Sequence, residues 1–299
     1  MKTLFALASL AAASYAWFGD DDSTTEFNVT SMGKFKVKNA AFPEMGKYDD
    51  SDDFLIVSSF GALSSGHVYV VPDVASYIQN DDVKNADAFK LKTPSFEWPN
   101  EVKAVPSDVF EGKRAIVVPD GFLVPGKSNG GVYIIEIDAN DVTQAVNTYT
   151  LSKKKGFYHH MGFWVDLNGD GRKDFLTARS NTKAGQGELL WLEHPEGGFE
   201  TENWTEHVIG NMADVGIDMV EMSQYKHEIV VFCAEFFNQV LSVTRISTID
   251  GSLVSTRVID DSTILDVYLA QYRDINGDGT KELLVNNHEK SDKTNGIFQ

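Results

Sequence analysis

Two nine-residue segments carry oxygen-bearing side chains at a spacing that suits a metal ion. In each, side-chain oxygens at positions 1, 3, 5 and 9 point toward one centre, the carbonyl at position 7 adds another oxygen, and glycines at positions 4 and 6 permit the tight turn. Oxygen ligands with three carboxylates per loop suit Ca²⁺, whereas Mg²⁺ keeps more waters. The predicted ligands are Asp166, Asn168, Asp170, Arg172 and Asp174 in the first segment, and Asp274, Asn276, Asp278, Thr280 and Glu282 in the second.

These segments differ from the calcium loop of an EF-hand. That loop needs a bidentate glutamate at position 12, where this chain has Thr177 and Val285. The flanking residues also have the pattern of strands rather than helices. The alternative to two calcium sites is a pair of solvated turns, in which the Asp and Asn side chains bond to their own backbone.

A second set of side chains capable of chemistry lies at the start of short predicted strands. Adjacent strand residues face opposite sides, so His159 and His160 are not expected to bind one metal, but either would serve as a ligand or proton donor. Asp214 and Asp218 would act as general acid or base. The alternatives are structural or surface histidines, and carboxylates left over from decayed acidic loops. The full set is Tyr158, His159, His160, Asp214 and Asp218, with Asp266 and Tyr268 in a similar position.

The elements that would position these residues recur along the chain. Short apolar strands begin at residues 54, 115, 175, 229 and 283, in steps of 61, 60, 54 and 54. One complete unit has strands at residues 162–165, 175–178, 187–192 and 204–209. A steady repeat of this length with about four strands per unit predicts an all-β fold, a β-propeller of about five four-stranded blades.

The predicted propeller covers residues 34–299. Its fifth unit has only three predicted strands, the last being Gly296-Ile297-Phe298. A strand predicted over Lys34–Lys38 would pair with that unit and close a five-bladed ring, since an open ring leaves an exposed edge. Alternatively, the chain is a truncated form of a longer propeller.

Residues 1–16 have the pattern of a secretory signal peptide, and residues 17–33 form a short N-terminal segment. Lys2 supplies the positive charge, an apolar stretch follows, and small residues precede the expected cleavage after Ala16. We therefore expect a secreted protein. Asn28 and Asn203 lie in N-glycosylation sequons, which a eukaryotic secretory route uses.

Composition excludes several classes of protein. The 44 Asp and Glu residues outnumber 26 Lys and Arg, and the net charge of −18 argues against nucleic-acid binding. No apolar run after residue 16 is long enough for a transmembrane segment. The one cysteine, Cys233, lies in an apolar predicted strand and is expected to be a buried thiol. The sequence gives no indication of an oligomeric state.

The acidic segments, set between predicted blade strands, resemble the repeats of FG-GAP/VCBS β-propellers, as in the heads of integrin α-chains and many secreted microbial proteins. The motif Asp-x-Asn-Gly-Asp-Gly-x-x-Asp/Glu is specific in two units and degenerate in the other three, and the resemblance covers roughly residues 34–299. It implies a propeller with structural calcium at the blade rim, but it does not imply an activity. The signal sequence and overall pattern also resemble those of fungal secreted proteins.

The innermost strands of a propeller converge on a central funnel, which is the usual ligand site. We therefore expect a calcium-stabilised protein that binds a small molecule or glycan there. Trp164, Trp191 and Trp204 would stack on sugar rings or, alternatively, belong to the core.

The alternative function is an enzyme that uses the same funnel, and the sequence leaves this question open. The family to which the repeats are similar offers one precedent, a fungal sugar dehydratase built on such repeats, so a sugar lyase or dehydratase is one form of this alternative. Another form of this alternative is a hetero-Diels–Alderase-like cyclase, by analogy with propeller-like proteins of fungal natural-product pathways. Such an enzyme needs a shaped pocket and hydrogen-bond donors rather than a nucleophile. An apolar, aromatic funnel would favour the enzyme, and a polar one would favour the glycan binder.

Overall fold

The computed structural model describes residues 31–48, 53–121, 129–181 and 186–288. Within these ranges almost all regular structure is β-strand. The exceptions are a short helix, α1 (Val74–Gln79), and a 3₁₀ turn (Val83–Asn85). The predicted signal peptide, residues 17–30 and the sequon at Asn28 lie outside the described residues.

The described strands form five antiparallel sheets, in which strands adjacent in sequence are adjacent in space. The first sheet contains β1 (Ala40–Lys47), β2 (Asp53–Gly61), β3 (Ser64–Val71) and β4 (Phe89–Lys90). The second contains β5 (Lys103–Ala104), β6 (Arg114–Pro119), β7 (Gly131–Ile137) and β8 (Ala145–Lys153). The third contains β9 (Tyr158–Val165), β10 (Asp174–Ser180), β11 (Glu188–Glu193) and β12 (Thr205–Gly210). The fourth contains β13 (Gly216–Val220), β14 (Glu228–Glu235), β15 (Val240–Ser247) and β16 (Leu253–Asp260), and the fifth contains β17 (Val267–Arg273) and β18 (Glu282–Asn287).

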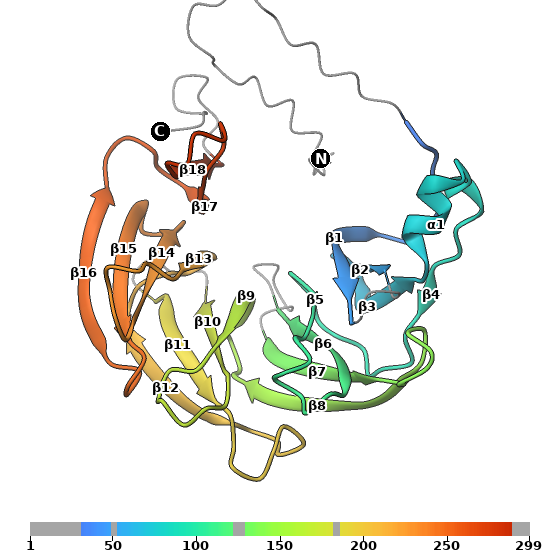
Figure 1. Cartoon of the computed structure of the whole chain (residues 1–299), viewed down its shortest axis with the longest axis horizontal. Coiled ribbons are helices and arrows are strands. Elements are labelled where there is room, and N and C mark those ends of the chain that lie inside the picture. Colours follow the sequence, from blue (N-terminus) through green and yellow to red (C-terminus); the bar gives the residue numbers. More distant parts are fainter. Residues whose placement is uncertain (1–30, 49–52, 122–128, 182–185, 289–299) are drawn as a thin grey trace, which may run out of the picture.

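The five sheets follow one another around a common centre, like the blades of a propeller (Figure 1). The first strand of each sheet lies nearest the centre. These inner strands contact one another or the next sheet, as β1 does with β5, β9 with β13, and β13 with β17. Among the described strands, none pairs the first sheet with the fifth, so this part of the chain forms an open ring.

The repeat predicted from the sequence is confirmed in its strand positions. The strands expected from residues 54, 115, 175, 229 and 283 are β2, β6, β10, β14 and β18, the second strand of each sheet. The fifth sheet has two described strands, and the third one predicted for it, residues 296–298, lies outside the described residues.

The prediction of a strand over Lys34–Lys38 is wrong. Residues 31–37 have no regular structure, and the inner strand of the first sheet is β1, which begins at Ala40. Asn39 has a φ angle of +54°, and this left-handed residue separates the lysine-rich segment from β1. Without a partner strand, the alternation of lysine and apolar residues is not sufficient to form a strand.

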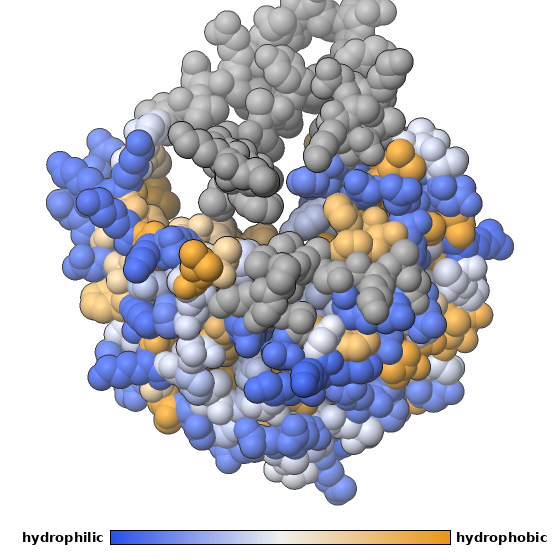
Figure 2. Space-filling view, turned by 180° about the vertical axis from the view of Figure 1, so that it is seen from behind, coloured by the Kyte–Doolittle hydropathy of each residue, from blue (hydrophilic) through white to orange (hydrophobic). Residues whose placement is uncertain are grey.

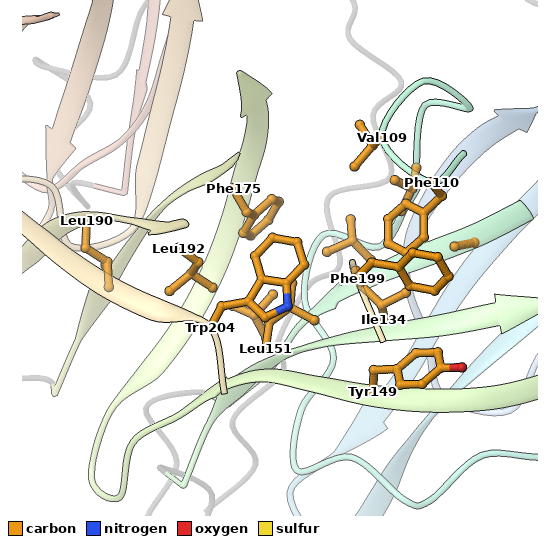
Figure 3. Packing of buried hydrophobic residues seen from close by; sticks show 14 residues of the cluster. Val109, Phe110, Ile134, Tyr149, Leu151, Phe175, Leu190, Leu192, Phe199 and Trp204 are labelled. Atoms are coloured by element: carbon orange, nitrogen blue, oxygen red, sulfur yellow. The ribbon is translucent and has the colours of Figure 1, made fainter. Parts of the chain in front are cut away.

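Apolar clusters fill the space between each pair of consecutive sheets. Between the second and third sheets, for example, Phe110, Ile134 and Leu151 pack with Phe175 and Trp204 (Figure 3). Equivalent clusters lie between the first and second, the third and fourth, and the fourth and fifth sheets. Burial of this apolar surface is the main force that holds the sheets side by side.

Cys233 belongs to the cluster between the third and fourth sheets and is fully buried. Burial raises the pKa of its thiol to about 12, so the thiolate is not formed at neutral pH. The expectation of a buried, unreactive thiol is therefore confirmed.

The outer surface is mostly hydrophilic on the face drawn in Figure 2, with apolar residues in scattered patches. This agrees with the excess of acidic residues in the composition. In the part of the chain that the structure describes, helices are too short to provide a membrane-spanning segment.

Replacing Gly216 with alanine is expected to lower the free energy of unfolding by about 1–3 kcal/mol. A Cβ atom at Gly216 in β13 would lie 2.2 Å from the carbonyl oxygen of Tyr268 in β17, so the two inner strands would have to separate. Gly197→Ala is the control, because Gly197 is exposed and its Cβ would meet only the Thr201 hydroxyl at 3.3 Å. Urea unfolding measures both, and equal stabilities would contradict the close approach of β13 and β17.

Candidate functional site

The two acidic segments fold into turns with the same internal hydrogen bonds. In the first, which joins β9 to β10, the carboxylate of Asp166 accepts the amides of the glycines three and five residues later, at 2.8 and 2.9 Å. In the second, which joins β17 to β18, Asp274 accepts the amides of the equivalent glycines at 2.7 and 2.9 Å. These glycines have φ angles of +75° and +86° in the first turn and +77° and +88° in the second, which favour glycine. The sequence repeat is therefore also a repeat of backbone geometry.

The closing acid of each turn bonds back to its beginning. Asp174 accepts the amide of Leu167, and Glu282 accepts the amide of Ile275, each at 2.9 Å. Asp174 also accepts the amide of His194 at 2.9 Å and is fully buried. Burial raises its pKa to about 6, although the two amides favour the charged form.

The two turns differ at position 7, where the first has Arg172 and the second has Thr280. The Arg172 guanidinium forms an ion pair with Asp170, the acid at position 5. In both turns the acid at position 5 accepts the backbone amide of position 7, at 2.8 Å for Asp170 and 2.7 Å for Asp278. In the second turn, which lacks the arginine, this hydrogen bond is the main cause that lowers the pKa of Asp278.

Among the described residues, no group of three or more His, Cys, Asp or Glu side chains is arranged to hold a metal ion. The turn carboxylates are instead bonded to backbone amides and, in the first turn, to Arg172. Calcium binding by the two acidic turns therefore remains a prediction from the sequence.

The two adjacent histidines face different surroundings, as expected for neighbouring strand residues. His159 is fully buried within the third sheet, where its Nδ1 lies 3.5 Å from the Thr177 hydroxyl. Burial lowers its pKa to about 3, helped by the nearby Arg179. His160 instead faces the centre of the ring, where its Nε2 lies 2.8 Å from the Tyr268 hydroxyl in β17.

His160 of the third sheet contacts side chains of the first and fifth sheets. Its ring packs edge-on against Phe42 of β1 at 5.6 Å and against Tyr268 at 5.4 Å between centroids. Phe42 in turn contacts Phe60, which stacks on Trp98 at 4.2 Å. Burial lowers the pKa of His160 to about 4, so its imidazole is neutral at pH 7, and its Nδ1 has no hydrogen-bond partner among the described residues.

Charged side chains lie beside this aromatic cluster at the centre. Glu101 and Lys103 form an ion pair of 3.0 Å and retain 25% and 28% of their side-chain exposure. The amide of Glu101 donates to the carbonyl of His160 at 3.2 Å, and the Lys103 ammonium lies 5.1 Å from the Phe163 ring centre. Burial raises the pKa of Glu101; Lys103 opposes the shift, and the carboxylates of Glu44 and Asp218 add to it.

Sequence reasoning missed Phe42, Glu44, Glu101 and Lys103. Glu101 and Lys103 flank Val102, which is fully buried, and this alternation is the signal of a strand with one solvated face. The signal covers too few residues to be found without the neighbouring sheets.

The other candidate catalytic residues make structural contacts. Both carboxylate oxygens of Asp214 accept amides of the β14–β15 turn, from Phe236 at 2.6 Å and Phe237 at 2.8 Å. Tyr158 is fully buried, and its hydroxyl donates to the carbonyl of Asp214 at 3.1 Å. Because these groups hold loops together, the structure gives them no free position at the centre from which to act on a ligand.

Asp218 joins two inner strands. Its carboxylate accepts two hydrogen bonds from the Arg273 guanidinium, at 2.9 and 3.0 Å, and one from the amide of Tyr272 at 3.0 Å. Asp218 is therefore held between β13 and β17, at the charged part of the centre, where it influences Glu101. Asp266, by contrast, accepts a hydrogen bond from the exposed Gln239 side chain at 2.9 Å.

The three tryptophans considered for sugar stacking belong mainly to the core. Trp191 and Trp204 are almost fully buried, and Trp191 stacks on His207 at 4.1 Å. Trp164 is half-buried and packs against the cluster between the second and third sheets. The core alternative therefore holds for Trp191 and Trp204. The second sequon is accessible, because Asn203 is exposed in the turn before β12.

A groove lies between the turn that joins β9 to β10 and the loop that joins β13 to β14. Its volume is about 670 Å³, which is within the range of small-molecule sites. Buried Val165 and Ile229 contribute its apolar part, and polar and aromatic residues from the two loops provide the rest. The residues from these loops that line it include Asp166, Lys173, Glu221, Ser223, Tyr225 and His227. No local pattern in the sequence indicates this groove, since its two walls are roughly 50 to 60 residues apart along the chain.

No protein-family model matches the sequence, and no curated protein sequence matches it either. Among solved structures, an endo-arabinase from Bacteroides thetaiotaomicron is similar over 91% of this chain and 100% of its own, with a TM-score of 0.44 and 11% identity. An α-L-arabinofuranosidase from Lactobacillus brevis is similar over 85% of both chains, with a TM-score of 0.44 and 9% identity. The propeller of Dos1 has a TM-score of 0.39 and 11% identity over 74% of this chain and 62% of its own. The likeness is distant in all three cases.

The stabilisation contributed by Asp120 and Asp214 is expected to decrease as the pH rises from about 4 to about 7. Burial raises the pKa of Asp120 to about 6 and that of Asp214 to about 7, above the value of about 3.9 for an unfolded chain. The native state therefore keeps protons in this window that the unfolded state has lost, and the stabilisation from those protons disappears as the pH rises through the folded-state pKa.

The measurement is the urea-unfolding free energy of the wild type and of Asp214→Asn, which cannot titrate at this position. The unfolding free energy of the wild type minus that of Asp214→Asn should become smaller as the pH increases from 5 to 7. A difference that does not change with pH would contradict the raised pKa of Asp214.

Proposed function

We propose that the protein is a secreted five-bladed β-propeller that binds a saccharide at its centre. Secretion rests on the signal-peptide pattern of residues 1–16, and the fifth blade on the third strand predicted at residues 296–298. The observation that carries the binding function is the set of central side chains. Aromatic residues and charged residues from all five sheets meet around His160 and Glu101.

This mixture suits a sugar better than an apolar molecule. Carboxylates such as Glu44 and Glu101 accept hydrogen bonds from hydroxyl groups, and Lys103 donates to them. Phe42 and Tyr268 offer apolar ring surface for the C–H face of a sugar. The partial exposure of Glu101 and Lys103 supports access of solvent, and hence of a polar ligand, to this region. A cyclase for apolar precursors is disfavoured, because it would have to desolvate these charges.

Tyr268→Phe and Glu101→Gln should weaken the binding of a neutral trisaccharide. The first removes a hydroxyl, with an expected loss of about 1 kcal/mol, or roughly fivefold in affinity. The second removes a charged acceptor, with an expected loss of about 1.5–3 kcal/mol, or roughly tenfold to a hundredfold. Tyr272→Phe is the matched control, because Tyr272 lies on the same strand but packs against Phe232 in the cluster between the fourth and fifth sheets.

Affinity is measured by isothermal titration calorimetry with cellotriose, xylotriose and mannotriose. The central site is rejected if both central variants bind every trisaccharide as tightly as Tyr272→Phe does.

A calcium ion in the second acidic turn is the other part of the proposal. Asp274, Asn276 and Asp278 supply side-chain oxygens, and each oxygen that accepts an amide keeps a second lone pair for a cation. The three carboxylates of this turn, Asp274, Asp278 and Glu282, are in none of the ion pairs found among the described residues, whereas Asp170 of the first turn is paired with Arg172. Calcium would be structural here, holding the turn between β17 and β18.

Removal of calcium with EDTA should lower the melting temperature, and added Ca²⁺ should restore it. Asp278→Asn should reduce this response, because it removes one of the negative charges that a divalent cation requires. Asp170→Asn at the equivalent position of the first turn should change the response less, because Arg172 already neutralises that acid. Differential scanning calorimetry tests this, and a melting temperature that is the same with EDTA and with Ca²⁺ would rule out the calcium site.

An enzyme that acts on a sugar at the same centre is the second candidate, in the class of lyases or dehydratases. The observation that favours it is the raised pKa of Glu101 beside Glu44 and Asp218, since a partly buried carboxyl near other carboxylates is suited to proton transfer. Turnover of the bound trisaccharide, lost in Glu101→Gln but kept in Tyr272→Phe, would distinguish it from a binding protein.

A further inference from the structure

The groove between the third and fourth sheets is formed by two loops whose backbones are fixed by hydrogen bonds. It has buried apolar atoms of Val165 and Ile229 between two loops that are each fixed by hydrogen bonds. On one side, the Asp166 carboxylate accepts amides of its own turn at 2.8 and 2.9 Å. On the other, the amide of Thr248 donates to the carbonyl of His227 at 2.8 Å, and the amide of Tyr225 donates to Met222 at 2.9 Å. The loops therefore do not have to be ordered by a ligand, which favours binding.

The charges that line the groove argue against a charged ligand. Lys173 is paired with Asp108 at 2.5 Å, outside the groove lining, and Glu228 is paired with Arg245 at 2.7 Å. The Arg245 guanidinium also covers the Tyr225 ring at 4.3 Å, so a second cation would be repelled there. An anion would meet the carboxylates of Asp166 and Glu221.

The polar groups that remain suit hydroxyls. Asp166 and Glu221 accept hydrogen bonds, the imidazole of His227 donates or accepts one, and the Tyr225 ring edge and Ile229 provide apolar surface. We propose that this groove is a second ligand site, separate from the centre, and that it binds a short neutral saccharide.

The decisive comparison uses two neighbouring surface substitutions. Ser223 lines the groove, whereas Gln224, next to it and also exposed, does not. Ser223→Arg fills the groove and adds a cation, and Gln224→Arg adds the same charge beside it. Both changes are on the surface, so both proteins should fold. Tyr225→Ala is a third variant, which removes an aromatic wall.

Isothermal titration calorimetry is carried out with cellotriose, xylotriose and mannotriose, on the wild type and on Glu101→Gln protein, in which the central site is weakened. At least one trisaccharide should bind to Glu101→Gln protein. Adding Ser223→Arg should weaken this binding at least tenfold, adding Tyr225→Ala should weaken it several-fold, and adding Gln224→Arg should leave it within twofold. The charged trimers of glucosamine and of galacturonic acid should bind at least tenfold more weakly than the neutral one.

Binding that is lost in Glu101→Gln and unaffected by Ser223→Arg would overturn the groove site and leave the central site in place. Binding that is lost in Ser223→Arg and unaffected by Glu101→Gln would support the groove and reject the centre. Absence of binding by all three neutral trisaccharides, or tighter binding of the glucosamine trimer, would overturn the groove proposal.

Discussion

The structure depends on sheets that are apolar on both faces and must be covered on both. Strand β14 illustrates this constraint, because alternate residues pack against different neighbours. Val230 and Phe232 belong to the cluster facing the fifth sheet, whereas Ile229, Val231 and Cys233 belong to the cluster facing the third. Such a sheet cannot be stable alone in water, and it needs a sheet on each side. A series of similar units around a centre is the arrangement that supplies these neighbours.

Stacking sheets in this way has a consequence for chemistry at the centre. Neighbouring inner strands lie close to each other, as the approach of Gly216 in β13 to Tyr268 in β17 indicates. Side chains that are far apart in the sequence therefore meet, as do His160 and Tyr268, which are 108 residues apart. Charged groups in the same place lose part of their hydration, and this raises the pKa of Glu101. The packing of the sheets thus determines both the composition of the central site and its electrostatics.

Much of the fold could be predicted from the sequence because it repeats. Each second strand is a short apolar run, and the runs at Phe54, Ala115, Phe175, Ile229 and Leu283 all begin at or next to the start of such a strand. The inner strands were harder to predict, since β5 has only two residues and the segment Lys34–Lys38 has the right alternation but no partner. Local pattern was a reliable guide only where a strand is long and covered on both sides.

The candidate sites were predicted less completely for a physical reason. The two acidic turns are local, so their geometry follows from their own residues. His160 was also identified, but its partners Phe42 and Glu101 come from other sheets, and no local pattern connects them. Asp214 has the chemistry of an acid or base, yet its two oxygens are used to hold a turn that begins 22 residues later. Whether a polar residue is structural or functional depends on such distant donors.

The first acidic turn contains its own counter-ion. Arg172 stands where the second turn has Thr280, and its guanidinium is covalently part of the loop that it neutralises. A counter-ion built into the chain is always present, whatever the composition of the surrounding medium, whereas a turn without one takes its balancing charge from solution. A single substitution at position 7 can therefore make one of two duplicated turns more sensitive than the other to the ions in solution, while both keep the same backbone.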